Sequence, residues 1–204
     1  MREFELLRAG TLCPFAAKAK IWTGPSWDVQ VSRSQCLQRC ARDLGDFSRV
    51  ALDEGYDGYV AEVGLPSDGG TDLEAVRRTF NWFLRGLALH DESCRECMAK
   101  DFLDKRWQFE YGSVRMFLNV FSSYYPKRHS KYAPIEGGFF VFFQPEFSFK
   151  KHKAVLDDSM KAYIRNRFAA AGMPYNGRQI DERIEALLYM FPEDPSGPPV
   201  TWWV

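Results

Sequence analysis

The sequence predicts an α+β fold in a single domain, residues 1–204, in which helices cover an antiparallel sheet. Two kinds of segment support this class: stretches with helical periodicity and short stretches dense in aromatic and β-branched residues. A third observation is that no repeat, low-complexity tract or domain-sized linker interrupts the chain. Its 204 residues are enough for one sizeable core and too few for two large domains.

Residues 33–47 are predicted to form the first helix. Cys36, Cys40, Leu44 and Phe47 recur at helical spacing and would share one face. A face of this kind needs a partner layer, so we expect the helix to pack on the sheet.

The second helix is predicted to begin at Thr71-Asp72-Leu73-Glu74, with Thr71 capping the first turn and Glu74 reaching back. It has the clearest apolar stripe in the chain, which consists of Val76, Phe80, Phe83, Leu87 and His90.

Three segments are predicted to be strands. Residues 58–63 alternate as a half-buried strand does. Residues 107–110 and 114–121 flank a glycine turn at 111–113 and are typical of a hairpin. Residues 138–143 are apolar throughout, which predicts a central strand.

Two further helices are predicted at residues 157–171 and 180–190, separated by a breaker at 172–177 that contains two glycines and a proline. A proline-rich tail, residues 192–199, precedes the final Trp202 and Trp203.

Charge and composition exclude several classes of function. The 27 basic and 27 acidic side chains cancel, so no overall field attracts nucleic acid or an anionic membrane, and we expect neither as a partner. No stretch approaches the roughly 20 apolar residues of a membrane helix. The first residues do not resemble a secretory signal, and five cysteines cannot all pair within one chain. We therefore expect a cytoplasmic protein with free thiols.

The three histidines are natural candidates for acid, base or metal chemistry. Only His90 belongs to a strong amphipathic stripe, which predicts that it faces the core. A buried imidazole needs a hydrogen-bond partner or a metal. His90 is then either a structural histidine satisfied by a backbone carbonyl or the proximal ligand of an iron macrocycle.

Four cysteines admit a tetrahedral zinc site, because Cys36 and Cys40, and Cys94 and Cys97, are closely spaced pairs. The alternative is that they are buried structural thiols. Cys13 stands apart from these pairs, and a thiolate is a known ligand of haem iron.

Basic residues crowd the loop after the hairpin, where Lys127, Arg128, His129 and Lys131 occur together. On a neutral protein this cluster is a candidate contact for carboxylates such as haem propionates, or else a solvated loop. Phosphate-binding loops, nucleophile elbows and paired-histidine metalloprotease motifs are absent from the sequence.

The order of these motifs resembles the YqcI/YcgG family, whose members include haem-dependent N-hydroxylases of guanidine-containing amino acids. The resemblance rests on Cys13-Pro14-Phe15-Ala16, the strand near 59–63, Leu89-His90-Asp91, the hairpin with its basic loop, and the strand at 139–145 followed by Ile164-Arg165. It covers most of the chain. The chain departs from the pattern at Ser122 and Ser123, where the family has histidine and proline.

The resemblance implies a monooxygenase with haem b, iron protoporphyrin IX, that N-hydroxylates a guanidine or amino group of a small amino acid such as arginine, in specialised metabolite biosynthesis. Dioxygen and electrons from an external reductase would be required. His90 is the expected iron ligand, with Cys13 and His129 as alternatives, and Cys13, Lys127, Arg128 and Lys131 are expected to bind the cofactor.

Two other functions remain open from the sequence. One is a non-catalytic haem carrier or sensor with two strong axial ligands. The other is a zinc-stabilised interaction module built on the four paired cysteines.

Overall fold

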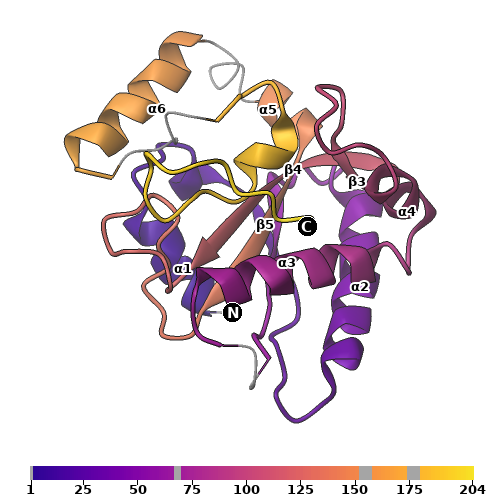
Figure 1. Cartoon of the computed structure of the whole chain (residues 1–204). Helices are drawn as coiled ribbons and strands as arrows, with labels where there is room; N and C mark the ends of the chain where they lie inside the picture. The colour runs from indigo at the N-terminus through magenta and orange to yellow at the C-terminus, as the bar shows by residue number, and fades with distance from the viewer. Residues whose placement is uncertain (1, 67–69, 152–157, 174–179) are drawn as a thin grey trace.

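Five strands form one mixed sheet in the order β1-β2-β5-β4-β3 (Figure 1). The structure is a computed structural model, and it describes residues 2–66, 70–151, 158–173 and 180–204. The strands are β1 (Ile21–Thr23), β2 (Gly58–Glu62), β3 (Phe109–Tyr111), β4 (Val114–Ser122) and β5 (Phe139–Pro145). Only the pair of β1 and β2 is parallel. The predicted α+β class is confirmed, and the apolar segment at 138–143 is the central strand β5, as expected.

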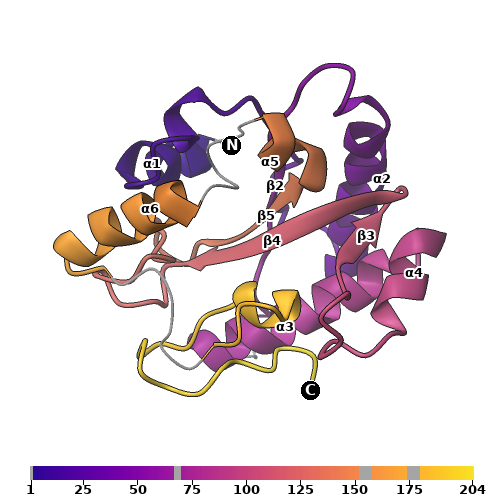
Figure 2. The ribbon, with the colours of Figure 1, turned by 90° about the horizontal axis from the view of Figure 1, so that it is seen from above.

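Helices lie on both faces of this sheet. They are α1 (Arg2–Gly10), α2 (Arg33–Val50), α3 (Leu73–Leu87), α4 (Glu92–Met98), α5 (Glu146–Lys151) and α6 (Asp158–Ala170), with short 3-10 helices η1 (Ala16–Lys18) and η3 (Glu185–Leu188). Figure 2 shows α1, α5 and α6 on one side of β4 and β5, and α3 with the C-terminal segment on the other. None of the helices among the described residues is long and apolar enough to cross a membrane.

Strand β4 divides its side chains between the two faces. Met116, Leu118 and Val120 are buried in the main core, which α2, α3 and α4 complete. The intervening Phe117 and Asn119 are only partly buried and point to the opposite face, because successive side chains of a strand alternate. This second face supplies the candidate site described below.

Local sequence explains where the two long helices begin. The Ser32 side chain accepts a hydrogen bond from the backbone N–H of Gln35, and Oε1 of Gln35 accepts one from the backbone N–H of Ser32, which completes a capping box for α2. At α3 the cap is Asp72, whose Oδ1 accepts from the Ala75 N–H at 2.7 Å. The prediction of Thr71 as this cap is wrong, because the better acceptor stands one residue later.

The predicted hairpin is confirmed as β3 and β4. Its two turn residues, Gly112 and Ser113, have φ of 56° and 59°. Two consecutive left-handed residues match the right-handed twist of the flanking strands.

Several short elements differ from expectation. No strand was predicted at the position of β1. Strand β2 was predicted to be half-buried, but four of its five residues are buried, and it lies inside the sheet between β1 and β5. The predicted helix at 180–190 is wrong: only η3 is helical there. The backbone of this segment instead follows the edge of β4, where the Val120 N–H donates to the Tyr189 carbonyl at 3.0 Å. Helix α6 is confirmed over 158–170, while Asp157 lies outside the described residues.

The C-terminal tail is anchored by Trp202, which is fully buried in the main core. Its indole Nε1 donates to the Ala186 carbonyl at 2.7 Å, and its ring contacts Phe80 and Phe102 with centroids 5.0 and 5.1 Å apart. This contact fixes η3 against the sheet and so positions one wall of the candidate site.

Candidate functional site

Three cavities adjoin one another along the half-buried face of β4, and we call them together the β4 trough. The central cavity has a volume of about 670 Å³. The Cys13 cavity, about 150 Å³, shares Asn119 and Lys131 with it. The α5 cavity, about 250 Å³, shares Phe117 and Glu185 with the central cavity. Because neighbouring cavities have wall residues in common, the trough is one candidate binding region of the size typical for small ligands.

The alternation of β4 builds the floor of the trough. Arg115, Phe117 and Asn119 line the central cavity, and Phe121 continues the row into the Cys13 cavity. All four are odd-numbered residues of a regular strand, so one face of one strand provides a basic, an apolar, an amide and a second apolar side chain in order.

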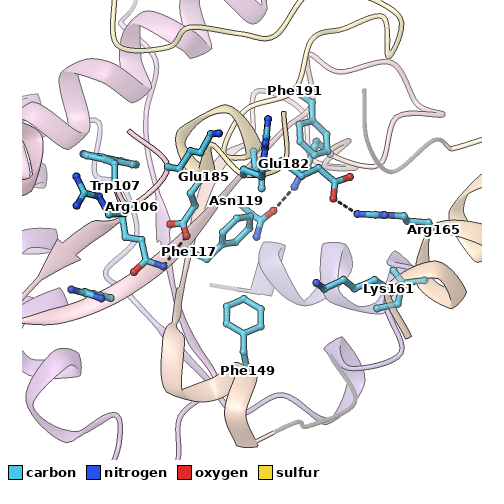
Figure 3. A pocket seen from close by; sticks show the side chains of 17 residues that line it. Arg106, Trp107, Phe117, Asn119, Phe149, Lys161, Arg165, Glu182, Glu185 and Phe191 are labelled. Carbon is cyan, nitrogen blue, oxygen red and sulfur yellow. Dashed lines mark hydrogen bonds and ion pairs between the residues drawn. The ribbon is translucent and has the colours of Figure 1, made fainter. Parts of the chain in front are cut away.

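The central cavity is strongly basic on a protein of zero net charge. Seven cationic side chains and two acidic ones line it: Lys105, Arg106, Arg115, Lys131, Lys161, Arg165 and Arg183, with Glu182 and Glu185. Figure 3 shows Lys161 and Arg165 on the α6 side, across the cavity from Glu185. Arg165, Arg106 and Arg183 form ion pairs with Glu182, Asp104 and Asp181, so the cationic excess rests on Lys105, Arg115, Lys131 and Lys161. The excess favours an anionic ligand.

Aromatic rings form the apolar part of the same walls. Trp107 and Phe191 are buried, while Phe117 and Phe149 are partly exposed to the cavity. Figure 3 shows Phe149 facing Phe117 across the opening. A ligand held here would combine apolar faces with anionic groups.

Lys131 is the most buried basic residue of the trough, with 3% of its surface exposed. Its Nζ donates to Oδ1 of Asn119 and lies 4.6 Å from the ring centroid of Phe191 and 5.3 Å from that of Phe121. Burial lowers the pKa of this amine from 10.5 to about 7, and the charge of Cys13 opposes the shift. Lys131 can therefore gain or lose a proton near neutral pH.

The Cys13 cavity places a partly exposed thiol beside this amine. Phe4, Phe142 and Phe168 supply apolar walls. The hydroxyl of Ser130, which also lines the cavity, is buried and has no hydrogen-bond partner among the described residues. A buried hydroxyl without a partner is unfavourable, and a bound ligand or water would satisfy it.

Glu185 lies in the wall between the central and α5 cavities. Its carboxylate accepts hydrogen bonds from the Tyr189 hydroxyl and, at 3.0 Å, from Nε2 of Gln108. Burial raises the pKa of this carboxyl, while the two hydrogen bonds act in the opposite direction.

His90 is exposed, in the turn just beyond the end of α3, so the prediction that it faces the core is wrong. Its N–H donates to the Leu87 carbonyl at 2.9 Å, and the chain has left the helix before the apolar stripe reaches position 90. His90 lines none of the three cavities. The role of His90 as a metal ligand stays a prediction, but the burial from which it was predicted is not observed.

His129 is buried and stacked on Tyr125, with ring centroids 4.2 Å apart. Both ring nitrogens have backbone partners: Nε2 contacts the Pro192 carbonyl at 3.2 Å, and Nδ1 accepts from the Lys131 N–H at 3.1 Å. Burial lowers its pKa to about 4, so the ring is neutral at physiological pH. These contacts are those of a structural histidine. The remaining histidine, His152, lies outside the described residues.

The four predicted cofactor contacts separate into two groups. Lys131 and Cys13 belong to the trough, and Lys131 is buried rather than part of a solvated loop. Lys127 and Arg128 are exposed and line none of its three cavities. The loop exposes Lys127 and Arg128 and buries Lys131, and the sequence alone did not distinguish these directions.

The zinc site predicted from four cysteines is wrong for the described part of the chain, where no three potential metal ligands come together. Three of the four buried thiols have a local hydrogen-bond partner. Cys36 donates to the Asp28 carbonyl at 3.2 Å, Cys40 contacts the Tyr59 hydroxyl at 3.4 Å, and Cys97 donates to the Cys94 carbonyl at 3.2 Å.

Ser122 and Ser123 stand at the end of β4, outside the lining of the trough. Ser122 is fully buried, and its hydroxyl accepts from the Tyr124 N–H at 3.3 Å. The serine therefore supports the turn into the basic loop.

Several trough residues were not identified from the sequence. Phe117 was a candidate from its aromatic ring, and Asn119 could have been found from strand alternation once the open face of β4 was known. Glu185 and Lys161 come from segments more than 35 positions beyond β4 in the chain. No local motif marks these two, because only the tertiary fold brings η3 and α6 to β4, whereas Arg165 belongs to the motif Ile164-Arg165.

Searches among curated proteins and among solved structures each gave no match. The model of the YqcI/YcgG family matches residues 13–181, which is most of the chain and includes Cys13, Lys131 and all of β4. Together with the motif order in the sequence, this match shows that the protein belongs to the YqcI/YcgG family.

Proposed function

We propose that the protein is a haem-dependent monooxygenase that N-hydroxylates a guanidine or amino group of a small amino acid, with the β4 trough as its site. Membership of the YqcI/YcgG family supports this proposal. The observation that carries it is the central cavity, which joins aromatic walls to an excess of cationic side chains. Haem is flat, largely apolar and carries two propionates, so its chemistry complements both features.

The residues present fit haem in three respects. The central cavity has a volume of about 670 Å³, within the range of cofactor sites. Phe117 and Phe149 offer apolar faces, and Lys161 and Arg165 are candidate partners for the propionates.

The iron ligand is assigned to Cys13. Histidine, cysteine, methionine and tyrosine are the usual protein ligands of haem iron. None of these lines the central cavity within the described part of the chain, whereas Cys13 lines the adjoining cavity.

When bound and reduced by an external donor, haem would supply the activation of dioxygen that N-hydroxylation requires. The protein's own residues would bind and orient the reactants and control protons. Asn119 holds the amine of Lys131 at the junction of two cavities. With a pKa of about 7, that amine can hold or release a proton at Nζ during turnover. The rings of Trp107 and Phe191 limit the access of water to the central cavity.

Absorption spectroscopy tests the proposal. Protein expressed with a haem precursor should show a Soret band, and the reduced carbon monoxide complex should have the red-shifted position of a thiolate ligand. Cys13→Ala should lose that position, whereas Cys36→Ser, which alters a thiol outside the trough, should keep it. Incubation with arginine, dioxygen and a reductant should add one oxygen atom to the substrate, detected by mass spectrometry. Absence of a Soret band would overturn the proposal.

A further inference from the structure

The carboxylate of Glu185 has hydrogen-bonding capacity left over. A carboxylate offers about four acceptor sites on its two oxygens. Tyr189 and Gln108 each use one, on different oxygens. One further site on each oxygen is therefore open, in a residue that lines two cavities. Two parallel acceptors match a guanidinium, and either one matches an ammonium group.

Glu185 also lacks a cationic partner of its own. Within the described ranges no lysine, arginine or histidine forms an ion pair with it, although basic residues surround the central cavity. Removing a carboxylate from water is costly unless an opposite charge compensates it. Burial accordingly raises the pKa of Glu185. A cationic ligand would restore the compensation that the fold does not provide.

The groups around Glu185 are suited to the same ligand. Phe117 and Phe149 share both of its cavities, and an aromatic face attracts a cation. Of the charged groups that act on Glu185, Glu146 of α5 adds negative potential and Arg115 of β4 opposes it.

We propose that Glu185 is the residue that selects the substrate by charge: it binds the guanidinium or terminal ammonium of a small amino acid. The inference rests on the proposed function, since it names the recognition element of that site. It assigns Glu185 a role in specificity and orientation.

The first test uses the full-length protein and two ligands that differ only at the group in question. L-Arginine carries a guanidinium, and L-citrulline carries an uncharged urea of nearly the same shape. Titration calorimetry should show that arginine binds at least tenfold more tightly, which is the selectivity expected when one charged hydrogen-bonded pair distinguishes two ligands. Equal binding of the two, or binding of neither, would overturn the inference without any variant.

Glu185→Gln supplies the second test, because glutamine keeps the shape and an acceptor for Tyr189 but removes the charge. The preference for arginine should fall to about threefold or less, with citrulline affinity nearly unchanged. Glu182→Gln is the matched control: Glu182 lines the same cavity but is exposed and already paired with Arg165. This control should keep the preference. A folded Glu185→Gln protein that still prefers arginine as strongly as the wild type would refute the role of Glu185.

The pH dependence of the wild type provides an independent readout. As pH falls through the pKa of Glu185, the carboxyl becomes neutral and the preference for arginine should disappear, while citrulline binding stays level. A preference that persists at acidic pH in folded protein would contradict the assignment. The outcome is separable from that of the proposed function. A Soret band without charge selectivity would refute Glu185 alone, and selectivity without a Soret band would refute haem alone.

Discussion

Replacing Lys131 by methionine should stabilise the protein in a pH-dependent manner. The pKa of Lys131 falls from 10.5 to about 7 on folding because burial disfavours the charged amine. Between these values the unfolded chain binds more protons than the folded one, so the free energy of unfolding rises with pH across this window. At about 1.4 kcal/mol for each pH unit, the window corresponds to about 5 kcal/mol. This is an upper limit, because local relaxation reduces the cost of burial.

The assay is urea denaturation of wild type and Lys131→Met at about pH 7 and about pH 9. Over these two pH units the wild type should gain about 2–3 kcal/mol relative to the variant. Lys127→Met, in the same loop but exposed, should follow the wild type at both pH values. Comparing differences between proteins removes the contribution of titrating groups that are common to all three and distant from Lys131. A wild type whose stability relative to Lys131→Met does not change with pH would refute the account of Lys131.

Four further substitutions, one of them a control, test the fold and the revised site. Asp72→Ala should cost about 1 kcal/mol in urea denaturation because it removes the cap of α3, whereas Thr71→Ala should change stability by a few tenths of a kcal/mol. Equal costs would contradict the assignment of the cap. Trp202→Ala should lose about 3–5 kcal/mol, measured in the same way, and a loss below about 1 kcal/mol would show that the tail is not anchored. His90→Ala should change neither the melting temperature nor the haem content, and a variant without haem would reinstate His90 as a ligand.

The strand pattern was readable from the sequence because the strongest strands bury apolar side chains in an unbroken or alternating order. Strand β5 is apolar over residues 139–143, and its place between β2 and β4 agrees with the burial of side chains on both of its faces. Strand β1 has only three residues, too few for a periodic signal. The segment 180–190 has helical spacing, yet its contact with the edge of β4 determines its backbone. Tertiary packing therefore overrides local preference there.

The candidate site could be predicted only in part. Cys13 and Lys131 were identified from residue type and local context, and the fold places both in the β4 trough. His90 was misassigned because helical periodicity was extended past the last residue of α3. Glu185 has no sequence signal, since its surroundings are made by Gln108 and Tyr189 only after the chain folds back on itself.

The central claim, that haem occupies the β4 trough, is tested most directly by titrating haem into the purified protein. Lys161→Glu with Arg165→Glu reverses two charges at the cavity wall, and Lys127→Glu with Arg128→Glu reverses two exposed charges outside it. We predict that the first pair weakens haem binding at least tenfold, about 1.4 kcal/mol, and that the second pair leaves it within about twofold. Haem binding that is lost with the second pair and retained with the first would contradict the account. It would show that haem binds at the exposed loop that contains Lys127 and Arg128.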